Sequence, residues 1–86
     1  MHNNKKIVTL LIVNKYTISK AALVGDTYIV PFSNLELFKK LCQGLLFKGV
    51  IFSGDYSAGV SWSSSIELSH FVRSHMIKGG QILVIS

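Results

Sequence analysis

The same order of local signals occurs twice along this chain of 86 residues. A Gly-Asp pair typical of a tight turn comes first, then a Ser followed three residues later by a Glu, as in a helix capping box. A Lys-Gly pair and an apolar segment close each copy. The first copy has Gly25-Asp26, Ser33, Glu36 and Lys48-Gly49, and the second has Gly54-Asp55, Ser64, Glu67 and Lys78-Gly79. Helices and strands are therefore expected to alternate.

Apolar segments rich in β-branched residues predict the strands. Residues 6–13 (KIVTLLIV) are almost continuously apolar, which predicts a central strand covered on both faces. Residues 16–24 and 27–32 flank the Gly25-Asp26 turn and predict a hairpin. Residues 50–53 and 81–85 enclose a helical segment, so they predict a βαβ unit with two parallel strands.

Apolar residues at helical spacing predict two helices, over residues 33–47 and 65–77, with Gly44 as an alternative, earlier end of the first. We expect Ser33 and Ser64 to cap their starts, and a lysine to suit the dipole at each end. The two lysines are Lys48 and Lys78. Cys42 falls within the apolar stripe of the first helix and is interpreted as an inert core thiol. His75 falls on the apolar face of the second helix. It is interpreted as a satisfied core or helix-end histidine, the alternative being a histidine that makes stability depend on pH.

Together these elements predict one domain over residues 1–86, of the mixed α/β (α+β) class. Its single sheet has four to six strands and two helices, with the βαβ unit at its C-terminal end. Helices on one side would leave a sheet face uncovered, and only 15% of the residues are charged while 49% are hydrophobic. We expect that face to meet a partner or a second copy of the chain, the alternative being a well-filled small core.

Candidate catalytic groups are scarce. All four carboxylates already have structural interpretations, as the two turns and the two capping boxes. The segment 54–59 (GDYSAG) lacks the first Gly of a Gly-x-Ser-x-Gly nucleophile elbow, because Asp55 occupies that position. His70 and His75 diverge by roughly 140° on a helix and do not share a metal. We therefore expect no enzyme activity, no metal and no cofactor; a phosphate pocket in the Gly/Ser-rich loop is the alternative, which Glu67 disfavours.

The longest apolar run, residues 7–13, is far shorter than a membrane span and lacks a following cleavage site of small residues. Cys42 is the only cysteine, which fits a reducing compartment. The expected location is therefore the cytoplasm. Small, basic, apolar chains of this kind are also common among phage and mobile-element products.

The formal net charge is +5, from nine basic and four acidic residues. This balance favours an acidic partner. The lysines are scattered and no stripe of Arg, Asn or Gln suggests base reading, so nucleic-acid binding would be to the backbone. The residues assigned to this alternative are Lys5, Lys6, Lys39 and Lys40.

The leading interpretation is a non-enzymatic protein-binding or regulatory module. Its predicted surface combines the Gly/Ser-rich loop 54–65 with the outer face of the second helix, and extends to the uncovered sheet face. Trp62 is the expected contact anchor, and a phosphate on a loop serine would alter the charge at the helix start. The predicted partner-binding residues are Tyr56, Trp62, Ser63, Ser64, His70, Arg73 and Ser74.

The segment VIFSGDYSAGVSWSSSIELSHFVRSHMIKGGQILVI, residues 50–85, resembles STAS domains, the anti-sigma factor antagonist family. That family also passes from a buried strand through a loop with a Ser pair into a helix and a further strand. Ser63 or Ser64 matches its regulatory serine. The family's Asp before the serines is Trp62 here, its Gly after them is Ser65 or Ile66, and its final helix is missing. The resemblance implies a non-catalytic module that docks through the start of the second helix.

Overall fold

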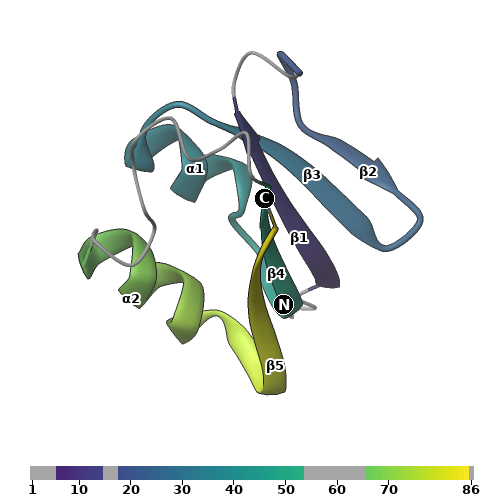
Figure 1. Ribbon diagram of the computed structural model, residues 1–86, viewed down its shortest axis with the longest axis vertical. Helices are drawn as coiled ribbons and strands as arrows, with labels where there is room; N and C mark the ends of the chain where they lie inside the picture. The colour runs from purple at the N-terminus through teal and green to yellow at the C-terminus, as the bar shows by residue number, and fades with distance from the viewer. Residues whose placement is uncertain (1–5, 15–17, 54–65, 86) are drawn as a thin grey trace.

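The computed structural model describes residues 6–14, 18–53 and 66–85 of the chain (Figure 1). Five strands form one mixed sheet in the order β2-β3-β1-β4-β5. All neighbours are parallel except β2 and β3. The elements are β1 (Lys6–Asn14), β2 (Ala22–Val24), β3 (Thr27–Phe32), α1 (Leu35–Leu41), β4 (Leu45–Ser53), α2 (Ile66–Ser74) and β5 (Met76–Ile85). The predicted mixed α+β class is confirmed, including the strand–helix–strand arrangement at the C-terminal end.

Strand β1 is the central strand, as predicted, with β3 on one side and β4 on the other. Strands β3 and β4 are each parallel to β1 and therefore to each other, but they are not neighbours because β1 lies between them. The prediction that β1 is covered on both faces holds for only part of the strand. Val8, Leu10 and Ile12 on the helix side are fully buried. On the other face Ile7 is 47% exposed and Leu11 is half-buried, and burial is reached only at Val13.

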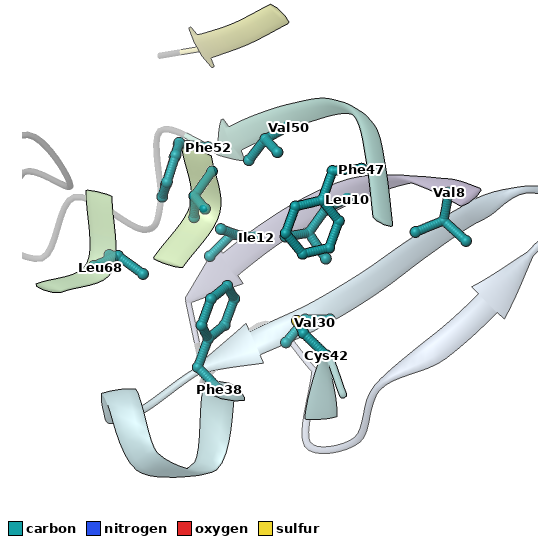
Figure 2. Packing of buried hydrophobic residues seen from close by; sticks show 11 residues of the cluster. Val8, Leu10, Ile12, Val30, Phe38, Cys42, Phe47, Val50, Phe52 and Leu68 are labelled. Atoms are coloured by element: carbon teal, nitrogen blue, oxygen red, sulfur yellow. The ribbon is translucent and has the colours of Figure 1, made fainter. Parts of the chain in front are cut away.

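Both helices lie on the same side of the sheet (Figure 1). The rings of Phe38 in α1 and Phe71 in α2 meet edge to face, with centroids 5.6 Å apart. Phe38 also lies 5.5 Å from the ring of Phe32 at the end of β3. Figure 2 shows Phe38 and Leu68 pointing from the two helices toward the sheet residues of the buried cluster. The core is therefore a single layer between the helices and one sheet face.

The hairpin between β2 and β3 turns at Gly25-Asp26, as predicted. Gly25 adopts φ +64°, a left-handed conformation that a residue without Cβ reaches at low cost. Strand β3 has the predicted bounds. Strand β2 spans only residues 22–24 of the predicted 16–24; residues 15–17 lie outside the described part of the chain.

Helix α1 is shorter than predicted at both ends. Its N-cap is Asn34, whose side-chain Oδ1 accepts a hydrogen bond from the Leu37 N–H at 2.9 Å, so the predicted Ser33 cap is wrong. The helix ends at Leu41, and Gly44 adopts φ +81° three residues later. Residues 45–47, assigned to the helix from their apolar character, instead begin β4.

Helix α2 likewise ends at Ser74 rather than at residue 77, because the chain turns at His75 and enters β5 at Met76. Lys48 and Lys78 therefore lie within strands, and their predicted place at helix ends is wrong. The predicted Ser64 cap lies outside the described residues.

Candidate protein-binding surfaces

A row of apolar residues crosses the sheet face that the helices leave uncovered. The registers place Leu11 of β1 beside Ile29 of β3 and Ile51 of β4. The same row continues to Ala22 in β2 and to Leu83 in β5. It therefore spans all five strands and contains no charged residue.

The same face is apolar at its margins as well. Ile85 lies two residues beyond Leu83 in β5, and both side chains are 52% exposed. Val24 at the far edge is 63% exposed. Side chains in adjacent strands shield one another in the middle of the sheet, which leaves Leu11, Ile29 and Ile51 half-buried although no described helix covers them. We refer to this surface as the open face.

Apart from Ile66 at its start, which is 84% exposed, the exposed side of α2 is polar. His70, Arg73 and Ser74 are all exposed, on the side opposite the buried Leu68 and Val72. The Nε–H of Arg73 lies 3.4 Å from Ser69 Oγ, and the hydroxyl of Ser74 donates to the Phe71 carbonyl at 3.0 Å. The predicted loop residues Tyr56, Trp62, Ser63 and Ser64 lie outside the described residues.

These two surfaces do not form one patch. The exposed side of α2 faces away from the sheet, and the open face lies on the opposite side of the sheet from both helices (Figure 1). The sequence therefore predicted both surfaces, but not their separation by the whole thickness of the fold.

His75 occupies the turn between α2 and β5 rather than the middle of a helix face. Its Nδ1 lies 2.9 Å from the Phe71 carbonyl oxygen and 3.1 Å from Ser74 Oγ. Its ring centroid is 4.3 Å from that of Phe71 and 6.3 Å from that of Phe47. The His75 ring is half-buried and has hydrogen-bonding and aromatic partners, which favours its interpretation as a satisfied histidine at a helix end over a pH-sensitive one.

Cys42 lies in the core, as predicted, with no exposed surface. Burial raises the pKa of its thiol from 9.0 to about 12, because the thiolate is poorly solvated there. A thiol in this environment is a weak nucleophile near neutral pH.

Basic side chains gather at the end of the sheet where the parallel strands begin. Lys6 opens β1, and its backbone N–H donates to the Gly44 carbonyl at 3.3 Å, directly after the last turn of α1, which contains Lys39 and Lys40. Both helices end here because each crosses back from the end of one strand to the start of another. Arg73 in the last turn of α2, Lys48 in β4 and Lys78 in β5 lie at the same end. We refer to this region as the basic end.

Two of the described carboxylates lie away from the basic end. Glu36 and Glu67 occupy the first turns of the helices, at the other end of the sheet. Asp26 forms an exposed ion pair with Lys48. The hydrogen bond from the Lys48 ammonium, together with its charge, holds the pKa of Asp26 below its ordinary value. Among the described residues, most of the cations therefore lie at one end of the sheet, and Glu36 and Glu67 lie at the other.

No three His, Cys, Asp or Glu side chains in the described segments gather where they could hold a metal ion. None of the described helices has the length and apolar character needed to cross a membrane. No family model, curated protein or solved structure matches the chain. The resemblance to STAS domains therefore stays a prediction.

Proposed function

We propose that this protein is a non-enzymatic protein-binding module whose partner covers the open face. The observation behind the proposal is the uncharged row through Leu11, Ile29 and Ile51, which runs from one sheet edge to the other with no described helix over it. Contiguous apolar surface of this kind is typical of sites where soluble proteins meet other proteins.

The charge distribution points to the chemistry of that partner. The basic end borders the open face where Lys6, Lys48 and Lys78 lie. A partner surface with apolar residues at its centre and carboxylates along one margin complements both features. The expected partner is therefore an acidic protein.

The placement of the described carboxylates supports a non-enzymatic role. Asp26 is paired with a lysine, and Glu36 and Glu67 lie in the first turns of helices, where a negative charge favours the helix dipole. The only cysteine is a buried thiol with a raised pKa. Each of these described groups has a structural role, so none of them is an obvious donor for acid–base or nucleophilic chemistry.

The exposed side of α2 is a second contact surface in this proposal. His70, Arg73 and Ser74 would act there together with Trp62 and the serines of the preceding loop, and a phosphate on Ser63 or Ser64 would regulate the contact. Replacing Trp62 and Arg73 together by Ala tests it. Unchanged retention of every partner by that variant would exclude this surface from binding.

Quantitative affinity capture, with the wild-type chain and two variants as baits, tests whether the partner binds the open face. One bait has Leu11→Thr and Ile51→Thr, which remove apolar contact while keeping residues that suit strands. Its control has Leu23→Thr and Leu37→Thr, two apolar residues on the helix side of the sheet that are 45% and 43% exposed. We expect an acidic protein that the wild type and the control retain after nuclease treatment, and that the open-face variant loses at least tenfold. Equal retention by both variants would contradict the proposal.

Nucleic-acid backbone binding is the second candidate function, and the basic end favours it. The fold brings Lys6 to the same end as Lys39 and Lys40, although the sequence separates them by more than thirty residues. Lys5 lies outside the described residues. Binding through these cations would weaken steeply with salt, with the slope of log K against log salt reduced by about one for each lysine replaced by Ala. A flat salt dependence would exclude this function.

A further inference from the structure

Strand β5 forms one outer edge of the sheet. Its residues Gln81–Ile85 pair with Gly49–Ser53 of β4 on one side. On the other side no described strand pairs with it. Strand edges present backbone N–H and C=O groups that are satisfied most completely by another strand.

Side chains of this edge strand are exposed on both faces of the sheet. Val84 belongs to the row beside Phe52 on the helix side of the sheet, yet Val84 is 65% exposed whereas Phe52 is 1% exposed. The helix layer therefore ends before it reaches Val84. On the open face, Leu83 and Ile85 are also exposed. Both faces of the edge strand consequently offer apolar contact.

The other sheet edge is blunted. Strand β2 has only three residues and ends in the tight turn at Gly25-Asp26. Very short edge strands are one way in which proteins prevent further strand pairing. Growth of the sheet is therefore favoured at β5 alone, and pairing of like edges about a two-fold axis closes after two copies.

We propose that β5 pairs antiparallel with β5 of a second copy of the chain, giving a ten-stranded sheet with all four helices on one side. Residues 79–85 contain no charged side chain, so an acidic or basic strand finds no charge complement along this edge, whereas the same segment of a second copy is uncharged and mostly apolar. In a register with Leu83 near the axis, Val84 of each copy lies opposite Ile82 of the other. The two Lys78 side chains then lie at opposite ends of the strand pair.

A bend in β5 limits the length of this pairing. The register with β4 shifts between Phe47 and Gly49, where β5 passes from Met76 to Gln81, and Gly79 adopts φ +87°. A Cβ on Gly80 would collide with the Met76 side chain, so the bend is tight. Bends and bulges interrupt strand pairing. The dimer contact is therefore confined to residues 81–85.

Two identical substitutions at opposite sheet edges test the dimer. Val84→Lys places a charge on the β5 edge, and Val24→Lys places one on β2, where the replaced valine is similarly exposed at 63%. Sedimentation equilibrium of the full chain and both variants, from about 5 to about 200 µM, measures the dimer dissociation constant. This concentration range suits a small, weak interface. Circular dichroism checks that each variant is folded.

We expect the wild type and Val24→Lys to dimerise with similar dissociation constants, and Val84→Lys to weaken the dimer at least about 100-fold, because two-fold symmetry introduces the charge twice. A monomeric wild type over the whole range, equal weakening by both variants, or a dimer unaffected by Val84→Lys would each overturn the proposal. The dimer and the open-face partner share Leu83 and Ile85, but their tests are separate, since Val84 lies on the helix side of the sheet and Leu11 and Ile51 lie outside β5.

Discussion

Replacing Phe38 by Ala should remove a ring of α1 that contacts both the sheet and α2. Phe38 is 1% exposed, and its ring lies 5.5 Å from Phe32 and 5.6 Å from Phe71. Truncating a buried Phe to Ala costs about 3–5 kcal/mol through lost transfer energy and the cavity left behind. Loss of the two ring contacts, worth about 0.5–1.5 kcal/mol each, moves the expected cost toward the upper half of that range.

That cost is large for a chain of this size. At about 0.05–0.15 kcal/mol per residue, 86 residues give a free energy of unfolding of roughly 4–13 kcal/mol. Urea denaturation followed by circular dichroism measures the loss. We expect Phe38→Ala to lower the unfolding free energy by about 4 kcal/mol or to unfold the protein, and Phe38→Leu, a gentler change, to lower it by about 1–2 kcal/mol.

Leu37→Ala is the matched control. Leu37 is the neighbouring residue of the same helix but is largely exposed, so its truncation should cost less than about 1 kcal/mol. A loss for Leu37→Ala equal to or larger than that for Phe38→Leu would refute the reasoning, because it would place the wrong face of α1 against the sheet.

Three further predictions concern single side chains. Asn34→Ala should lower the unfolding free energy measured in urea by about 1 kcal/mol and Ser33→Ala by less than about 0.5, because Asn34 is the N-cap of α1; the reverse order would restore Ser33 as the cap. A rise in the pKa of Cys42 from 9.0 to about 12 lowers its thiolate fraction at pH 8 about a thousandfold, so disulfide reagents should label the native protein at least that much more slowly than the urea-unfolded protein; rates within tenfold would contradict its burial. The Asp26 carboxyl, titrated by NMR, should show a pKa below 3.8 that rises with added salt, since the Lys48 contact stabilises the folded state above pH 3.8 and is lost as the pH falls through the folded-state pKa; a pKa at or above 3.8 would exclude the ion pair.

Much of the fold follows from local signals. Residues 27–32 form a strand with the predicted bounds because a Gly-Asp turn precedes it and helix-start signals follow it. Residues 45–47 were assigned to the wrong element because three consecutive apolar residues suit a buried strand and a helix equally well. Gly44, which adopts a positive φ, is the true boundary between α1 and β4. This glycine is visible in the sequence, but the apolar pattern around it was given more weight.

The candidate surfaces were predictable only in part. The exposure of His70, Arg73 and Ser74 follows from helical periodicity. The open face was expected for a sheet with helices on one side, but β1 was predicted to be covered on both faces, since its sequence shows no polar alternation. The basic end depends on strand order, because Lys6 and Lys40 come to the same end of the sheet only when β1 starts beside the end of α1.

The most direct test of the central claim is the amount of protein retained by the wild-type chain and by its Leu11→Thr, Ile51→Thr variant after nuclease treatment at moderate salt. The account predicts an acidic protein in stoichiometric amount on the wild type and at least a tenfold loss on the variant. Retained material that disappears with nuclease, or a protein bound equally by both baits, would contradict the claim that the open face is the binding surface.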